Sequence, residues 1–137
     1  MNARIVSVAE GYRLSRSISV GPHGLTADEP QPISTDMGPT PGELLLAALG
    51  ACTSMTVRAF ADRHGWPLDQ VDVSVRFDEQ GRIVKDLRLT GELEAAHFKQ
   101  LFTIAGHCPV HRLLAREASI VTVPTVVAKQ AARDLQN

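Results

Sequence analysis

Two cysteines are the residues of this chain with the most informative chemistry, because the sequence contains no others. Cys52 lies within the apolar stretch 41–53, and Cys108 directly precedes a proline. A thiolate is a nucleophile that can be oxidised to a sulfenic acid or a disulfide. We expect the two cysteine-bearing segments to face a shared site, so the pair indicates redox chemistry rather than a structural disulfide.

The two thiols are expected to differ in acidity. Cys108 precedes Pro109, which suits the first position of a helix, so its sulfur lies near free backbone N–H groups that stabilise a thiolate. Cys52 lies about three turns into its own helix, where burial among apolar side chains raises a thiol pKa. An inert capping role for Cys108 and a buried apolar role for Cys52 remain alternatives. Three side chains beside Cys108 could add positive charge: His107, His111 and Arg112.

Glu43 is a further candidate site residue, although its position is also typical of a helix cap. Thr40 and Glu43 have capping-box spacing at the start of a helix that we predict to run to about His64. On a regular helix, Glu43 lies half a turn out of phase with Cys52 and roughly 13.5 Å from it along the axis. Glu43 could therefore reach the Cys52 thiol only across a dimer interface or through a break in the helix.

A zinc site is an alternative use of the cysteines and their neighbouring histidines. Mixed nitrogen and sulfur ligands suit zinc, but Cys108 and His111 form a single short pair with no second matching pair. Adjacent residues such as His107 and Cys108 rarely bind one ion together. We therefore predict no metal and no other cofactor. The four residues considered as ligands are Cys52, His107, Cys108 and His111.

The composition indicates a single domain over residues 1–137 with its own core. Hydrophobic residues make up 44% of the chain, and the formal net charge of −1 argues against nucleic-acid binding. The start of the sequence lacks the apolar stretch of a secretory signal, and the longest apolar run, 44–52, is shorter than the roughly 20 residues that span a bilayer. We expect no membrane partner and a cytoplasmic protein with reduced thiols.

The pattern of apolar residues predicts an α+β fold. The first half of the helix over 41–64 is apolar on nearly every side, and one small sheet covers only one side of a helix, so we expect a partner subunit to cover the other. A second helix is predicted over 95–105 and a short third helix from Pro109. The expected strands are 5–8 and 17–20, a hairpin of 71–77 and 83–93, and a closing strand at 119–123. A surface loop is expected over 21–41. Residues 125–137 are compatible with a strand followed by a helix.

Three segments resemble the OsmC/organic hydroperoxide resistance family. They are residues 23–30, the motif over 38–56 that contains Cys52, and the Cys-Pro-Val-His motif at 108–111. The similarity runs over most of the chain, from about 23 to 123. The resemblance implies an OsmC-like fold, with antiparallel sheets packed on a long central helix, and an intertwined homodimer with thiol sites at the subunit interface.

The resemblance also implies a thiol peroxidase without a cofactor. Cys52 would attack an organic hydroperoxide and become a sulfenic acid, and Cys108 would resolve it to a disulfide that an external dithiol reduces. Glu43 at the start of the long helix and an Arg from the N-terminal strands, Arg16 rather than Arg13, would complete the site. The substrate would enter an apolar cleft near two further residues, Leu49 and Met55.

This chain departs from the family pattern in two respects: the residue after the proline, and the arginine, for which both Arg16 and Arg13 are candidates. Peroxidase members often have an acidic residue directly after the proline, where this chain has Gly42, and Glu43 follows one place later. The alternative function is a redox sensor or a small-molecule binding protein on the same fold. A structural protein whose cysteines never meet is a third hypothesis.

Overall fold

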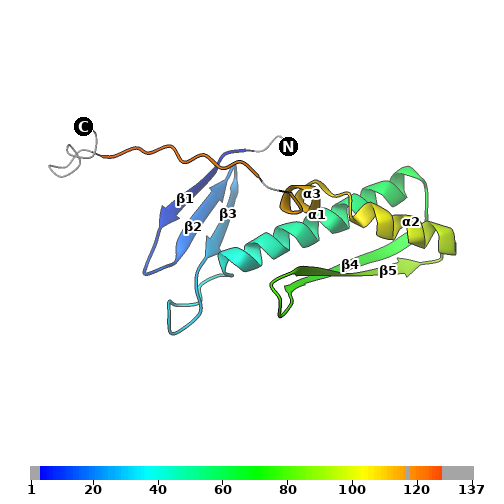
Figure 1. Ribbon diagram of the computed structural model, residues 1–137, viewed down its shortest axis with the longest axis horizontal. Coiled ribbons are helices and arrows are strands. Elements are labelled where there is room, and N and C mark those ends of the chain that lie inside the picture. The colour runs from blue at the N-terminus through cyan, green and yellow to red at the C-terminus, as the bar shows by residue number, and fades with distance from the viewer. Residues whose placement is uncertain (1–3, 117, 128–137) are drawn as a thin grey trace.

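The structure, a computed structural model, describes residues 4–116 and 118–127. It is an α+β fold in which antiparallel sheets accompany one long helix, as the sequence predicts (Figure 1). The elements in chain order are β1 (Val6–Glu10), β2 (Arg16–Val20), β3 (His23–Ala27), α1 (Pro41–Arg63), β4 (Leu68–Phe77), β5 (Ile83–Gly91), α2 (Ala95–Ala105) and α3 (Pro109–Leu114).

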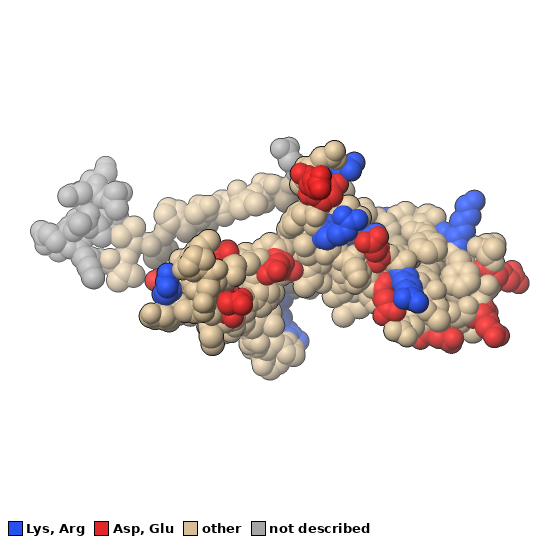
Figure 2. All heavy atoms as spheres, turned by 90° about the horizontal axis from the view of Figure 1, so that it is seen from below, with Lys and Arg blue, Asp and Glu red and all other residues tan. Residues whose placement is uncertain are grey.

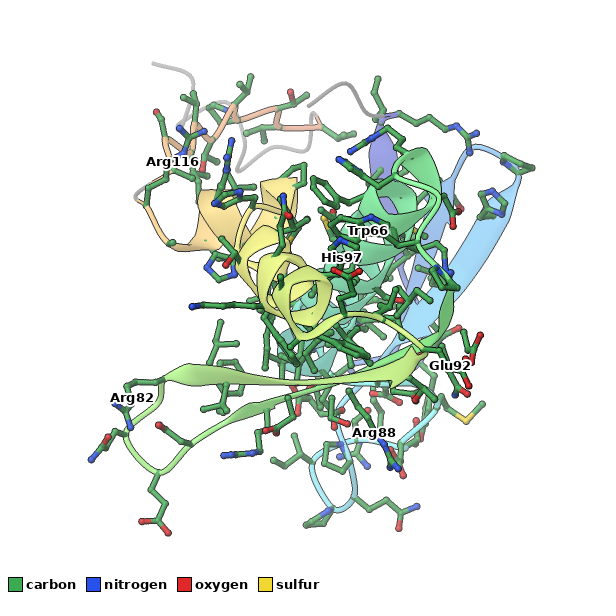
Figure 3. All side chains as sticks on the ribbon, turned by 90° about the vertical axis from the view of Figure 1, so that its right-hand side faces the viewer. Trp66, Arg82, Arg88, Glu92, His97 and Arg116 are labelled. Atoms are coloured by element: carbon green, nitrogen blue, oxygen red, sulfur yellow. The ribbon has the colours of Figure 1, made fainter. Side chains whose placement is uncertain are left out.

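The two sheets lie beside different parts of α1. The β1-β2-β3 sheet lies near the N-terminal end of α1, and the β4–β5 hairpin runs along the rest of it (Figure 1). Seen along the molecule, α1 and α2 both lie over the same face of the hairpin (Figure 3). The core is therefore a layer of side chains between two helices and a two-stranded sheet.

The core is small and is built on one stripe of α1. Val57 and Ala61 of α1 pack with Leu101 and Ala105 of α2 and with Leu68 of β4. Burying a side chain such as Val or Leu contributes roughly 1.5–3 kcal/mol. The alternation predicted for β4 and β5 provides the facing layer, to which the partly buried residues Val71, Leu87 and Leu89 belong.

Aromatic side chains fix α2 against the C-terminal end of α1. The Trp66 indole stacks on the His97 ring with centroids 3.9 Å apart, and these two side chains lie together in Figure 3. Phe60 and His64 continue the cluster, with ring centroids 4.2 Å apart. Because α2 leads directly into the turn that carries Cys108, this packing helps to position that cysteine.

The predicted ends of α1 are confirmed. The Thr40 side chain accepts a hydrogen bond from the Glu43 N–H, and the Glu43 carboxylate accepts one from the Thr40 N–H, which completes the capping box. His64 caps the other end, and Gly65 follows with a φ of 66°, a conformation that favours glycine. The helix therefore begins and ends at the capping and glycine residues that the sequence places at its two ends.

Two sequence expectations about strands are wrong. Residues 23–27 were expected in a loop, but they form β3, which pairs with β2 across the tight turn at Gly21, where φ is 55°. The closing strand expected at 119–123 does not form, because this segment is extended but has no ladder partner in the described chain. Residues 128–137, which include most of the ambiguous C-terminal segment, lie outside the described residues.

Much of the apolar surface of α1 is not covered by the chain itself. Met55 is 70% exposed and Leu45 is 40% exposed, so the burial on all sides predicted for this helix does not occur within one chain. Of the helices in the described residues, α1 alone is long and apolar enough to cross a membrane by length and composition, a test that the core helix of an assembled soluble protein also passes.

The charges on the surface are mixed. Figure 2 shows basic and acidic side chains interspersed on the face that it presents, with large uncharged areas between them. This distribution agrees with the near-neutral formal net charge of −1. A nucleic-acid interface would instead gather basic side chains on one face.

Candidate active site

The fold brings the two cysteines together from distant parts of the sequence. Cys52 lies on α1, and Cys108 lies in the turn between α2 and α3. The Cys52 thiol lies near enough to the Cys108 sulfur to lower its pKa. Both thiols are free, with Cys52 half-buried and Cys108 fully buried. The site therefore holds two neighbouring reduced sulfurs, one of them in a residue that stays partly exposed.

Hydrogen-bond donors surround the Cys108 sulfur. The backbone N–H of His111 donates to Sγ at 3.2 Å, and the Thr53 Oγ1 lies 3.5 Å from the same sulfur. Cys108 is the N-cap residue of α3, as its position before Pro109 predicts. The sulfur thus has the surroundings of a hydrogen-bond acceptor, which suits a thiolate.

A lysine on β5 completes the polar cluster. The Lys85 Nζ donates to the Thr53 Oγ1 at 3.1 Å and to the Ala105 carbonyl at 2.8 Å. Its strand partner in the β4–β5 ladder is Val75, and a methyl group added to Gly50 of α1 would lie 3.2 Å from a Val75 methyl. The glycine therefore allows α1 to approach the hairpin closely next to this lysine.

The surroundings of Cys108 shift its acidity. Burial alone raises the pKa of the Cys108 thiol, but hydrogen bonds from Thr53, from the His111 N–H and from Cys52 lower it, and so does the charge of Lys85. The net effect is a pKa below the ordinary value. Cys108 therefore ionises more readily than a free cysteine, as expected for a sulfur at the start of a helix.

Two neighbouring bases respond to the same environment. Burial lowers the pKa of Lys85, while the nearby cysteine thiolates raise it in part. Burial, followed by the charges of Lys85 and His107, lowers the pKa of His111. The imidazole of His111 is therefore neutral near pH 7, and its buried Nδ1 has no hydrogen-bond partner among the described residues.

A pocket of about 550 Å³ opens beside this cluster. Lys85 and His111 provide its polar groups, and Leu49 of α1 is one of its apolar walls, as the sequence predicts. Met55, the other residue expected near the cleft, does not line it and is 70% exposed. The remaining lining residues are Gly81, Ile83, Leu114 and Ala115.

Glu43 and the candidate arginines do not contact the thiols within this chain. Glu43 is exposed and caps α1, and it lines a second pocket of about 630 Å³ with Arg76. Arg13 donates to the carbonyls of Pro32 and Ile33, and Arg16 donates to backbone carbonyls near the β1–β2 turn. One chain therefore brings together two of the three predicted catalytic residues.

The side chains at the site do not form a metal-binding group. Within residues 4–116 and 118–127, no three His, Cys, Asp or Glu side chains lie where they could hold one ion together. The cation that lies among the thiols is an ammonium group, that of Lys85. The chemistry of the cluster is therefore that of thiols beside a lysine.

Sequence reasoning missed Thr53 and Lys85, although both carry a detectable signal. Thr53 is the polar member of the buried stripe of α1, which repeats every four residues. Lys85 is the charged member of the alternating positions on β5 that face the helices. A polar side chain on the buried side of a helix or strand needs a hydrogen-bond partner. Here Lys85 donates a hydrogen bond to Thr53.

The sequence and the fold both match one protein family. The family model for OsmC-like proteins matches residues 34–123. The fold is similar to that of an OsmC-like protein from Mycoplasma pneumoniae, with a TM-score of 0.70 and 17% identity over 83% of this chain and 88% of that chain. No curated protein matches the sequence.

Two further solved structures share the fold. An organic hydroperoxide resistance protein OsmC from Legionella pneumophila has a TM-score of 0.56 and 19% identity over 83% of this chain and 90% of that chain. An OsmC-like protein from Vibrio cholerae has a TM-score of 0.62 and 12% identity over 82% of this chain and 93% of that chain. Since the family match covers more than half of the sequence and both cysteines, this chain belongs to the OsmC-like protein family.

Proposed function

We propose that this protein is a thiol peroxidase that reduces organic hydroperoxides. The observation that carries the proposal is the proximity of a half-buried Cys52 and a fully buried Cys108 beside a pocket. A half-buried thiol can meet a substrate, and its buried neighbour can react only with it. Membership of a family that includes organic hydroperoxide resistance proteins supports the same chemistry.

In the first step the Cys52 thiolate attacks the outer oxygen of the hydroperoxide. A sulfur–oxygen bond forms and the oxygen–oxygen bond breaks, which leaves a sulfenic acid on Cys52 and an alkoxide. The alkoxide takes up a proton and leaves as an alcohol. The apolar wall at Leu49 suits the organic part of the substrate, and the ammonium group of Lys85 in the same pocket suits the negative charge of the leaving oxygen.

In the second step the Cys108 thiolate attacks the Cys52 sulfur. The sulfur–sulfur bond forms, the sulfur–oxygen bond breaks, and the departing hydroxide is protonated to water. An external dithiol then reduces the disulfide by thiol–disulfide exchange and is itself oxidised to a disulfide. The net reaction converts a hydroperoxide and a dithiol into an alcohol, water and a disulfide.

The working form of the enzyme that we propose is a homodimer in the cytoplasm, where thiols stay reduced. Within one chain, α1 exposes apolar side chains, and the extended segment 118–127 exposes Ile120, Val121 and Val123 to 80% or more. A second copy would cover these surfaces. It would also be the source of Glu43 and of an arginine, which one chain does not bring to its own thiols.

A redox sensor is the second candidate, because neither Glu43 nor any arginine among residues 4–116 hydrogen-bonds to the thiols. The two functions differ in turnover. A sensor would be oxidised once per protein, whereas a peroxidase would consume many equivalents of hydroperoxide when a dithiol is supplied.

The test combines mass spectrometry with steady-state assays using cumene hydroperoxide and a lipoyl or thioredoxin-type donor. We expect an intramolecular Cys52–Cys108 disulfide and repeated turnover in the wild type. We expect Cys52→Ser to lose hydroperoxide consumption by several orders of magnitude, as for removal of other enzyme nucleophiles. Full activity in Cys52→Ser would exclude Cys52 as the nucleophile, and stoichiometric oxidation without turnover would favour the sensor.

A further inference from the structure

Thr53 makes two hydrogen bonds, and the chemistry of lysine fixes the direction of one of them. The Lys85 ammonium group has only donors, so the Thr53 Oγ1 accepts the hydrogen bond at 3.1 Å. The Thr53 hydroxyl keeps its own proton to donate, and a Cys108 thiolate, which has no proton, can only accept it. Among the hydrogen bonds of the described residues, the Cys108 sulfur at 3.5 Å is the acceptor available to that proton.

The Cys108 sulfur is thus the end of a short chain of donors. It receives one hydrogen bond from the Thr53 hydroxyl, which Lys85 polarises, and another from the His111 N–H at 3.2 Å. The positive charge of Lys85 is held in place by its second bond, to the Ala105 carbonyl at 2.8 Å. In its thiolate form the Cys108 sulfur accepts both hydrogen bonds, so they stabilise the anion.

We propose that Lys85, acting through the hydroxyl of Thr53, is the positioning residue that keeps the resolving cysteine, Cys108, in its thiolate form. This rests on the proposed function, in which a thiolate must attack the Cys52 sulfenic acid. Cys108 has no exposed surface, so water cannot stabilise its charge. Lys85 and Thr53 supply that stabilisation from inside the protein.

The groups that face Lys85 come from each element packed around it. Cys52 and Thr53 come from α1, Cys108 from the turn before α3 and His111 from α3, while α2 contributes the Ala105 carbonyl. His107 lies near enough to His111 to lower its pKa. His111 is neutral near pH 7 because its pKa is lowered, so it does not replace the charge of Lys85. Lys85 is the cation that hydrogen-bonds directly to the hydroxyl beside the sulfur.

The test is a pH titration of the thiolate in the Cys52→Ser background, in which Cys108 is the remaining cysteine. Thiolate formation is followed by ultraviolet absorbance in the variants Lys85→Met, Lys85→Arg and Thr53→Val. We expect Lys85→Met and Thr53→Val each to lower the thiolate fraction of Cys108 near neutral pH by about tenfold, which is about one pKa unit. We expect Lys85→Arg to restore most of that fraction.

Arg88→Met is the matched control. Arg88 lies on the same strand but is exposed, and Figure 3 shows it on the side of the hairpin away from the helices. Its removal deletes the same charge from β5 and should leave the titration unchanged. If Lys85→Met does not fold, Thr53→Val decides the question, because it removes the hydroxyl and leaves the lysine in place.

The outcomes separate this proposal from the proposed function, because the titration uses no hydroperoxide. A titration of Lys85→Met or Thr53→Val that matches the Arg88→Met control overturns the role of Lys85, even if the protein is an active peroxidase. A shifted titration in a protein that does not reduce hydroperoxides upholds the role of Lys85 and excludes the peroxidase.

Discussion

Cys52 and Cys108 are neighbours but have different surroundings. Cys52 lies on the side of α1 where it is half-buried, whereas Cys108 is fully buried between Thr53, Lys85 and the start of α3. Cys52 therefore stays partly exposed, whereas the surroundings of the buried Cys108 lower its pKa. This asymmetry assigns the attacking role to Cys52 and the resolving role to Cys108 in the proposed cycle.

The Cys108→Ser variant tests this assignment. Since Cys52 keeps its exposure, we expect one equivalent of hydroperoxide to be consumed and a Cys52 sulfenic acid to accumulate, which dimedone labelling and mass spectrometry would detect. Steady-state turnover with a dithiol should fall by more than about tenfold. A Cys108→Ser protein that turns over at the wild-type rate would show that Cys108 is not the resolving thiol.

The cysteines could be recognised as candidate site residues from the sequence, because there are only two of them and each lies in a distinctive segment. The greater acidity of Cys108 was predictable for the same reason, since Pro109 marks the start of a helix. Thr53 and Lys85 could not be paired in advance, because their contact depends on how closely α1 approaches the hairpin. Gly50 lets α1 lie close to the hairpin, and the sequence alone does not show which strand residue lies opposite Gly50.

At the scale of elements, the loop between β3 and α1 is fixed by one buried carboxylate. The Asp28 side chain accepts hydrogen bonds from the Glu29 N–H, the Met37 N–H and the Thr35 hydroxyl at 2.8–3.0 Å. A hydrogen bond from Ser34, together with these bonds, outweighs burial and holds the pKa of Asp28 well below its usual range. The loop is thus tied together by a charge that the folded state favours.

The Asp28→Asn variant should be less stable than the wild type in a pH-dependent way. A lowered folded-state pKa gives stability that is present above the unfolded value of about 3.9 and is lost as the pH falls below it. The amide cannot accept all of the bonds that the carboxylate accepts. We expect a lower melting temperature at pH 7 and a difference from the wild type that shrinks below pH 4. A difference that is independent of pH would contradict this explanation.

The elements themselves were largely predictable, because periodicity and end signals are local. The helices α1, α2 and α3 and the β4–β5 hairpin begin and end close to the expected residues. The strand β3 was missed because its surroundings are rich in proline and glycine. The segment 119–123 has the composition of a strand, but no described strand pairs with it. Whether a segment pairs depends on the strands that lie beside it in the folded protein, and not on its composition alone.

At the scale of the whole molecule, one chain leaves two apolar surfaces without cover. One is the outer side of α1, and the other is the extended segment 118–127, where Ile120 is 87% exposed. The segment passes beyond the helices and runs toward the end of the molecule that holds the β1-β2-β3 sheet (Figure 1). A homodimer in which a second copy covers these surfaces, as we propose, would bury both.

The Ile120→Asp variant tests this assembly. A buried, unpaired carboxylate is costly, so we expect the substitution to convert a dimer into a monomer at micromolar concentration, measured by light scattering during size-exclusion chromatography. Thr125→Asp adds the same charge at a polar position of the segment and is the control. A monomeric wild-type protein, or a dimer that withstands Ile120→Asp, would contradict the homodimer.

In the proposed cycle, the complete burial of Cys108 would also decide which sulfur of the disulfide the reductant attacks. Once the disulfide has formed, an incoming reductant thiol can approach only the sulfur of Cys52, because the other sulfur has no accessible surface. The covalent mixed disulfide with the donor must then lie on Cys52, and Cys108 is the leaving group. A leaving thiol with a low pKa departs faster, so the surroundings that favour its anion would also speed its release.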